Sequence, residues 1–324
     1  MADRRTQARS VRLERYGDRD VLDVVDTPVP RPAPGEVLVE VRAAGINPGE
    51  VSLRTGALHG MFPMDFPFGQ GSDLAGVVAE VGEGVTGFAA GDEVLGYSWQ
   101  RSSHATHTVV PAAQLVRKPQ ELSWEVAGSL YVAGSTAWAA VEAVGPVEGR
   151  TVAVSAAAGG VGAIAVQLLA LRGARVLGIA SPANAAWLSA HGAVPVAYGD
   201  RIADDLVAAA SDAAAGKPGH LDAFIDLFGP EYVQLALDLG VPADRIVTVI
   251  SFAKAAATGA RVTGSAEASS AEVLAELAGL AAGGRIEIPV AATYPLERVR
   301  DAFAELEQRH TRGKIVLLPG GQQP

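Results

Sequence analysis

Three glycines near the middle of the chain form the pattern that points most directly to a chemical role. Gly159, Gly160 and Gly162 follow a short β-branched run and precede apolar residues at helical spacing. This order predicts a strand, a tight turn and a helix. Glycines in such a turn let a pyrophosphate approach the backbone, and the amides of the first helical turn, aided by the helix dipole, bind its negative charge.

The glycine pattern departs from the usual dinucleotide-binding fingerprint at its first position. The spacing is Ala157-x-Gly159-x-x-Gly162, so an alanine replaces the first glycine. In a chain with 37 glycines, a tight contact between a helix and a sheet is a second explanation. The pattern therefore needs support from the elements around it.

Apolar runs typical of buried strands supply that support, at residues 175–180, 194–198, 220–227 and 245–250. Alanine-rich stretches of helical length separate these runs. Parallel strands need crossover connections, which are usually helices. The alternation predicts an α/β protein with a doubly wound parallel sheet of the Rossmann type.

The cofactor preference is predicted from the end of the second strand, about 20 residues after the glycines, where NAD-binding proteins carry an Asp or Glu. Residues 178–184 read Gly-Ile-Ala-Ser-Pro-Ala-Asn, with no carboxylate to repel a 2′-phosphate. NADPH is therefore the predicted cofactor, with Ser181 and Asn184 as polar anchors. This loop lacks the Lys or Arg that usually pairs with that phosphate.

Composition limits the classes of function. A chain of 324 residues suggests about two domains, and a formal net charge of −10 argues against nucleic acid or an anionic membrane as the main partner. The absence of cysteine excludes disulfides, thiol catalysis and zinc sites built on thiolates. The charged N-terminal stretch lacks a secretory apolar core, and no apolar run approaches about 18 residues, so we expect a cytoplasmic protein.

Residues before the glycine turn have the texture of a separate β-rich module. Val37, Val39 and Val41 alternate with other residues as in a half-buried antiparallel strand, and shorter strand-like runs follow up to Val110. The sequence becomes helical near Leu122 and strand-like again from Ile286. The predicted domains are a β-rich domain at 1–130, completed by 289–324, and a nucleotide-binding domain at 131–288.

Taken together, these segments resemble the zinc-independent branch of the medium-chain dehydrogenase/reductases, typified by NADPH:quinone oxidoreductases. The resemblance runs through residues 34–56, 67–94, 133–141, 156–176 and 311–319, in order, and covers nearly the whole chain. It implies a GroES-like β-rich domain, a Rossmann domain, a cleft between them for nicotinamide and substrate, and a homodimer.

Two departures from the zinc-dependent branch decide the expected chemistry. Residues 45–50 read Gly-Ile-Asn-Pro-Gly-Glu where that branch has a catalytic Cys, and Gly71-Ser72-Asp73 replaces Gly-His-Glu. The three-ligand zinc site cannot be assembled, so we expect no metal and no Lewis acid for alcohol oxidation. The resemblance implies hydride transfer to a quinone or an α,β-unsaturated carbonyl, for which the protein supplies position and electrostatics.

The resemblance, together with the rule that cofactors bind at the carboxyl ends of parallel strands, assigns a cofactor-binding set. Structural alternatives stay open for four members. A helix N-cap would also explain Thr136, and a turn would also explain Asn47. Packing at a strand end would also explain Tyr198, and a solvated helix end would also explain Arg309. The predicted set is Asn47, Thr136, Gly159, Gly160, Val161, Gly162, Ser181, Asn184, Tyr198, Phe228, Ile250, Ser251 and Arg309.

The expected substrate is flat and apolar, because residues 57–68 (ALHGMFPMDFPF) are rich in Met, Phe and Pro. A buried hydrophobic loop is the alternative explanation of that stretch. The predicted pocket consists of Ser52, Met61, Phe62, Phe66, Tyr97 and Trp99.

No catalytic residue is assigned, because no candidate proton donor stands out. The candidates are Tyr97, Ser52, His59, His104 and water. A quinone or an enone can take its proton from solvent after hydride transfer, so a side-chain acid is not required.

Two other functions remain open. An enoyl-thioester reductase of the kind found in polyketide assembly lines would need basic residues for a pantetheine phosphate, and the nearby candidates are Arg101, Arg117 and Lys118. A catalytically silent NADP-binding protein would need only the glycine turn. Substrate-dependent oxidation of NADPH distinguishes these functions.

Overall fold

The computed structural model describes residues 7–211 and 219–320, and the chain is divided into two units. Unit 1 comprises Met1–Val132, Ser270–Arg285 and Pro289–Pro324. Unit 2 comprises Ala133–Ser269 and Ile286–Ile288. Residues 270–285, which the sequence-based boundaries assign to the nucleotide-binding domain, belong to unit 1.

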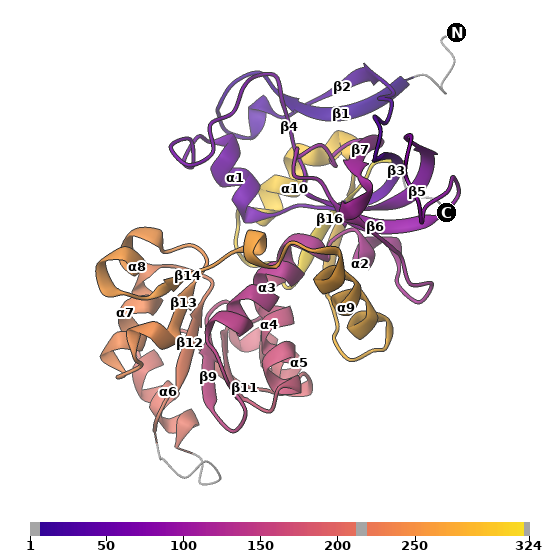
Figure 1. The fold of residues 1–324 in the computed structure, drawn as a ribbon. Coiled ribbons are helices and arrows are strands. Elements are labelled where there is room, and N and C mark those ends of the chain that lie inside the picture. The colour runs from indigo at the N-terminus through magenta and orange to yellow at the C-terminus, as the bar shows by residue number, and fades with distance from the viewer. Residues whose placement is uncertain (1–6, 212–218, 321–324) are drawn as a thin grey trace. The chain divides into compact units, whose positions relative to one another are not determined.

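Unit 2 is built on a six-stranded sheet in which every neighbouring pair is parallel (Figure 1). The predicted doubly wound sheet is confirmed, and the order of its strands corresponds to 3-2-1-4-5-6 along the chain. From one edge to the other, the strands are β11 (Ala193–Ala197), β10 (Arg175–Ala180), β9 (Thr151–Val154), β12 (Ala223–Asp226), β13 (Ile246–Thr248) and β14 (Arg261–Val262).

Helices connect these strands, as parallel neighbours require. The helix after the glycine turn is buried from Gly162 to Leu169, which explains why its sequence is apolar apart from Gln167. The helices are α3 (Tyr131–Ala143), which begins in unit 1, then α4 (Gly160–Leu171), α5 (Ala185–Ala190), α6 (Ile202–Ala210), α7 (Pro230–Asp238) and α8 (Phe252–Thr258).

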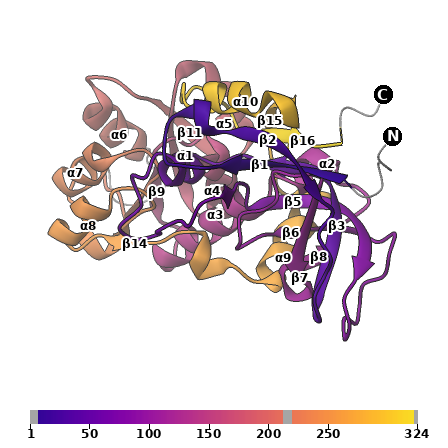
Figure 2. The ribbon, with the colours of Figure 1, turned by 90° about the horizontal axis from the view of Figure 1, so that it is seen from above.

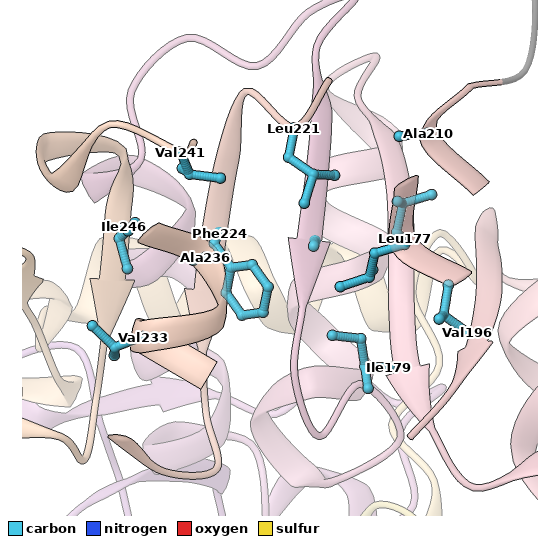
Figure 3. Packing of buried hydrophobic residues seen from close by; sticks show 12 residues of the cluster. Leu177, Ile179, Val196, Ala210, Leu221, Phe224, Val233, Ala236, Val241 and Ile246 are labelled. Atoms are coloured by element: carbon cyan, nitrogen blue, oxygen red, sulfur yellow. The ribbon is translucent and has the colours of Figure 1, made fainter. Parts of the chain in front are cut away.

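The core of unit 2 forms where side chains of the parallel strands meet their connecting helices (Figure 3). Phe224 on β12 is fully buried among aliphatic side chains that include Leu177, Val233 and Ile246. These residues come from separate strands and from α7, so one cluster joins the strands to the helix that covers them. The buried apolar area supplies the main stabilising term of this unit.

Unit 1 contains two mainly antiparallel sheets, of which one is three-stranded, in the order β2, β1, β4. The other follows the path β15, β16, β3, β5, β6, β8, and β7 also pairs with β3. The strands are β1 (Gln7–Leu13), β2 (Asp23–Pro28), β3 (Glu36–Gly45), β4 (Phe68–Gly69), β5 (Asp73–Val81), β6 (Glu93–Tyr97), β7 (His107–Pro111), β8 (Leu115–Arg117), β15 (Val290–Pro295) and β16 (Lys314–Leu318).

The C-terminal segment returns to unit 1, where β16 pairs antiparallel with β3 and places Val316 opposite Gly45. Figures 1 and 2 show the yellow C-terminal elements among the indigo and purple N-terminal strands. The helices of unit 1 are α1 (Pro48–Arg54), α2 (Trp124–Ala127), α9 (Ala271–Ala282) and α10 (Val299–Leu306).

Replacement of Phe224 by alanine is expected to lower the free energy of unfolding by about 3–5 kcal/mol, because it leaves a cavity in a core that packs at high density. Phe252→Ala is the matched control, since Phe252 is 40% exposed. Urea unfolding followed by circular dichroism measures both variants. Equal midpoints for the two variants would show that Phe224 is not part of the core of unit 2.

Candidate functional site

The glycine turn lies between β9 and α4, at the carboxyl end of the central strand. Gly159 is the N-cap of α4 and supplies no side chain to the helix start. A Cβ on Gly162 would lie 2.2 Å from the carbonyl oxygen of Ala156, so only glycine allows this close approach of helix and turn. The first amides of an α-helix have no intrahelical acceptor, which is the property that lets such a helix start bind an anion.

Asp226, at the end of β12, ties the loops around the glycine turn together. Its buried carboxylate accepts hydrogen bonds from the hydroxyls of Ser155 (3.1 Å), Thr248 (2.7 Å) and Ser251 (2.8 Å). It also accepts hydrogen bonds from the backbone amides of Phe228 and Gly229, each at 3.0 Å. These donors belong to β13 and to the loops that follow β9, β12 and β13, so one carboxylate fixes the carboxyl edge of the sheet.

The polar residues predicted to bind the adenosine phosphate follow β10. Ser181 precedes the 3-10 turn Pro182–Asn184, and the side-chain amide of Asn184 donates to the Ser181 hydroxyl at 3.0 Å. No acidic side chain lies between Gly178 and Asn184. Tyr198, just after β11, is 53% exposed, and both its cofactor-binding role and the alternative of packing at a strand end stay predictions.

Two aromatic rings meet on the other side of the glycine turn, after β12. Phe228 is 39% exposed and contacts Tyr232 edge to face, with ring centroids 5.7 Å apart. Burial raises the pKa of the Tyr232 hydroxyl, and the nearby acidic groups Glu231 and Asp226 add to that rise. The hydroxyl therefore stays neutral near pH 7.

The remaining predicted cofactor residues of unit 2 differ in what they offer to a ligand. Ile250 is 43% exposed, whereas Ser251 is buried and its hydroxyl is already bonded to Asp226. Thr136 is buried in the interior of α3, so the alternative of a helix N-cap is wrong. The cofactor-binding roles of these residues stay predictions.

In unit 1, a buried lysine joins the start of β16 to the start of β5 and to Asn47, which follows β3. The ammonium of Lys314 donates to the side-chain oxygen of Asn47 at 2.5 Å and to the carboxylate of Asp73 at 3.2 Å. Asn47 donates from its own amide to Asp73 at 3.1 Å, and Asp73 accepts the amide of Val132 at 2.6 Å. Asn47 is also the N-cap of α1, so the same residue shapes the turn before the helix and takes part in this cluster.

A second buried carboxyl, Glu50, lies beside this cluster. Its oxygens accept the backbone amides of Asn47 (3.0 Å) and Ser72 (3.2 Å). Burial raises the pKa of Glu50 above its ordinary value of 4.5, and Asp73 adds to the rise, while His104, the Asn47 amide and Lys314 oppose it. The side chain of His104 is fully buried and lies 3.8 Å from Glu50.

The residues predicted to form the substrate pocket all lie in unit 1, and several are aromatic. Tyr97 stacks on Tyr131 with centroids 4.1 Å apart, and Trp99 contacts Tyr97 edge to face at 6.1 Å. Burial raises the pKa of the Tyr97 hydroxyl, although a hydrogen bond with Trp99 opposes the shift. Trp99 and Phe62 are each 48% exposed.

Other residues of the predicted pocket are placed differently. Met61 is 55% exposed, whereas Phe66 packs against Tyr16 and the core of unit 1. The stretch 57–68 is therefore partly a buried loop and partly exposed apolar surface. Ser52 lies within α1 and is half-buried.

The two histidines considered as proton donors make hydrogen bonds within unit 1, and the last predicted cofactor residue is exposed there. The ring of His59 is hydrogen-bonded to the hydroxyl of Tyr16 at 2.7 Å, and His104 contacts the Gly45 carbonyl at 3.2 Å. Arg309 is exposed in unit 1, beyond the end of α10. Among residues 7–211 and 219–320, no group of three or more His, Cys, Asp and Glu side chains is placed to hold a metal ion.

Sequence reasoning missed the buried charged residues that organise both units. Asp226 and Lys314 each adjoin an apolar strand run, and a charge in such a run is the signal that marks a buried polar network. Asp73 and Glu50 stand out in the sequence only as departures from a zinc-binding pattern. Neither signal identifies the partners, because Lys314 and Asp73 are 241 residues apart in the chain.

Two family models match separate parts of the chain. Residues 33–120 match the family model described as alcohol dehydrogenase GroES-like domain. Residues 191–317 match the model described as zinc-binding dehydrogenase. Within the described residues, none of the helices has the length and apolar character needed to cross a bilayer.

Two sequence relatives extend the comparison. The chain is 32% identical to a probable quinone oxidoreductase of Schizosaccharomyces pombe over 233 residues, which are 70% of this chain and 67% of that protein. It is 33% identical to the polyketide synthase GfsB of Streptomyces halstedii over 297 residues, which are 87% of this chain but 5% of that protein.

Two solved structures share the fold over nearly the whole chain. The quinone oxidoreductase from Coxiella burnetii is 29% identical, with a TM-score of 0.85 and coverage of 96% of this chain and 99% of that one. The mycobacterial protein Rv1454c, solved with NADPH, is 28% identical, with a TM-score of 0.80 and coverage of 96% and 100%.

Asp226→Asn is expected to weaken cofactor binding about tenfold or more. An amide nitrogen in place of one oxygen leaves buried donors unpaired, at about 1–3 kcal/mol each, and loosens the loops that hold the turn. Titration with NADPH by fluorescence measures the dissociation constant. Asp222→Asn is the matched control, since Asp222 accepts the Thr151 amide at the opposite end of the sheet. Equal affinities of the two variants would contradict the role of Asp226.

Glu50→Gln is expected to change the pH dependence of stability. The raised pKa means that folded Glu50 binds its proton more tightly than unfolded Glu50, so its contribution to stability is lost as pH rises from 4.5 through the folded pKa. The free energy of unfolding of the wild type should therefore fall relative to that of Glu50→Gln, at up to about 1.4 kcal/mol per pH unit.

Urea unfolding at several values from pH 4.5 to about pH 8 measures the Glu50 slope. Glu272→Gln is the control, because hydrogen bonds at the start of α9 lower the pKa of Glu272. The contribution of Glu272 to stability therefore changes with pH in the opposite direction. A difference between the wild type and Glu50→Gln that stays constant with pH would show that Glu50 does not titrate in this range.

Proposed function

Because the chain belongs to the quinone oxidoreductase-like family of the medium-chain dehydrogenase/reductases, we propose that it is an NADPH-dependent reductase of quinones or α,β-unsaturated carbonyls. Its membership makes it an oxidoreductase with a GroES-like unit and a nicotinamide cofactor. The single observation that carries the proposal is the glycine turn at the start of α4, followed by a second strand without an acidic residue at its end.

The residues of unit 2 fit a dinucleotide. A Cβ on Gly159 would meet only the Ala156 carbonyl, at 3.3 Å, so the turn is open to a pyrophosphate on its outer side. The hydroxyl of Ser181 and the side-chain amide of Asn184 would donate hydrogen bonds to a 2′-phosphate, with no carboxylate between them to repel it. Bound NADPH would supply the hydride, and the protein would supply position.

The acceptor surface of unit 1 supports a flat apolar substrate. Met61, Phe62 and Trp99 are large apolar side chains that are about half-exposed, and Trp99 is held by its contact with Tyr97. Exposed apolar side chains that form one patch mark binding sites more often than ordinary surface, and Met61 and Phe62 are consecutive residues. A quinone or an enone presents a flat carbon skeleton to such a surface.

The proposal includes a reaction without zinc. Asp73 stands where the zinc-dependent branch has the Glu of Gly-His-Glu, and its carboxylate is occupied by the Lys314 ammonium and the Asn47 amide. Ser72 stands in the place of the His. A resident cation therefore already neutralises this carboxylate, and the proton for the reduced product comes from solvent.

A second candidate function is reduction of an enoyl thioester. The similarity to the polyketide synthase GfsB, at 33% identity, favours it.

The proposal also includes a homodimer. It is supported by β14, which is the edge of the six-stranded sheet and where Val262 is 47% exposed. A silent NADP-binding protein would share the turn but would not turn over any acceptor.

Oxidation of NADPH at 340 nm tests the proposal, with NADH run beside it. The acceptors are 1,4-benzoquinone, 9,10-phenanthrenequinone, a simple enone and crotonyl-CoA. We expect turnover of a quinone or an enone, with NADPH preferred to NADH. Turnover of crotonyl-CoA alone would favour the thioester reductase, and binding of NADPH without any turnover would contradict the proposed activity.

A further inference from the structure

Arg101 has an unusual position in unit 1, in the loop that follows β6. It is half-buried, its guanidinium lies over the Phe62 ring at 5.6 Å, and its backbone has a φ of 54°. This left-handed conformation is uncommon for a residue other than glycine and occurs often at functional sites. Phe62 is one of the exposed aromatic residues of the proposed acceptor surface.

Arg101 differs from every other cation that lies over an aromatic ring in the described part of the chain. There are five others, and each also pairs with a carboxylate at 2.6–3.1 Å. The closest parallel is Arg117, which lies over Phe88 at 6.0 Å and pairs with Asp92 at 2.8 Å. Among residues 7–211 and 219–320, no ion pair within 4.0 Å joins a carboxylate to the Arg101 guanidinium.

The ionisable groups around Arg101 do not neutralise it. Burial lowers its pKa, and Glu50 and Tyr131 act in the opposite direction with smaller effects. Both oxygens of Glu50 already accept backbone amides, and its own raised pKa weakens it as a fixed counter-ion. An arginine stays charged in any protein environment. Arg101 is therefore a partly desolvated cation, and no anion close to it offsets its charge.

The loop holds Arg101 in place. Its backbone amide donates to the Ser98 carbonyl at 3.1 Å, and the next residue, Ser102, bonds to the hydroxyls of Ser98 (2.9 Å) and Thr108 (2.6 Å). The carbonyl of Arg101 also lies so close to Gly69 that a Cβ there would be 2.7 Å away. A fixed loop therefore presents an unpaired cation beside aromatic surface.

We propose that Arg101 binds a negatively charged oxygen of the electron acceptor and thereby determines which acceptors the protein reduces. This inference rests on the proposed function. It follows from a cation that is fixed, partly desolvated, close to Phe62 and without an anion of its own. Guanidinium groups in such settings form strong charge-assisted hydrogen bonds with carboxylate or enolate oxygens.

The oxygen has two possible sources with the same chemistry. The acceptor can carry a carboxylate, or the charge can develop on its carbonyl oxygen. In the second case, hydride adds to the alkene carbon, the π electrons move to form an enolate, and solvent then protonates the α-carbon. A carboxylate is bound in the ground state and affects KM, whereas a developing enolate affects kcat.

The experiment compares trans-3-benzoylacrylate with its methyl ester, which differ only in the carboxylate. The variants are Arg101→Gln and Arg101→Lys, with Arg117→Gln as the matched control, because Arg117 also lies over a phenylalanine but has its own carboxylate. Thermal unfolding of each variant checks the fold. NADPH oxidation gives kcat and KM for both acceptors.

A carboxylate partner predicts that Arg101→Gln raises KM for benzoylacrylate about tenfold or more and leaves KM for the ester unchanged. A developing enolate predicts a fall in kcat of similar size for both acceptors, with KM unchanged. In both cases Arg101→Lys restores part of the loss. Parameters for Arg101→Gln equal to those for Arg117→Gln with both acceptors would overturn the inference.

A binding measurement separates this inference from the proposed function. Saturation-transfer NMR with benzoate needs no turnover, so it remains informative if the wild type reduces neither acceptor and the proposed function fails. Binding of benzoate by the wild type and by Arg117→Gln, with loss in Arg101→Gln, supports the anion site. Equal benzoate signals in all three proteins, together with no kinetic effect, rule it out.

Discussion

A buried carboxylate must receive its hydrogen bonds from the protein, and this requirement shapes the carboxyl edge of the sheet in unit 2. Asp226 is fully buried and accepts hydrogen bonds from five donors. The donors come from β13 and from three loops that are distant in sequence, so the loops cannot move independently without leaving a charge unpaired. The glycine turn is held in shape by residues that need not touch a ligand.

Unit 1 meets the same requirement with an ion pair. Lys314 neutralises Asp73, and Asn47 bonds to both, so the start of α1 is fixed against β5 and β16. An ion pair of this kind adds little to stability over apolar side chains of the same size, but removal of one partner is costly. Its value here is in position, because it sets where α1, which carries Glu50, begins.

The sequence was sufficient to predict the elements that have a regular apolar pattern. Strands β9 to β13 were predicted because each is a short apolar run followed by a stretch of helical length. Strand β14 was not, because it consists of two exposed residues, Arg261 and Val262, that pair on one side only. The shorter extent of β12, which begins at Ala223 rather than at His220, reflects the polar residues that precede it.

The side-chain clusters were harder to predict than the strands. A charged residue in an apolar run shows that a partner must exist, but the partner is chosen by the fold. Asn47 and Lys314 are 267 residues apart, and only the pairing of β16 with β3 brings them together. The unpaired state of Arg101 could not be inferred either, since it depends on which carboxylates the fold directs elsewhere.

The alanine at the first position of the glycine fingerprint has a structural explanation in the neighbouring strand. Ala157 is fully buried, and its amide donates to the Ile179 carbonyl at 3.0 Å, so the turn lies directly against β10. The residue that faces it there is Gly178, where a Cβ would lie 3.2 Å from the Ala157 methyl group. The missing side chain at position 178 provides the space that the methyl group at position 157 occupies, and Ala156 takes the left-handed turn with a φ of 47°. A close approach of the turn to the sheet therefore does not require glycine at one particular position, because either of the two facing residues can give up its side chain.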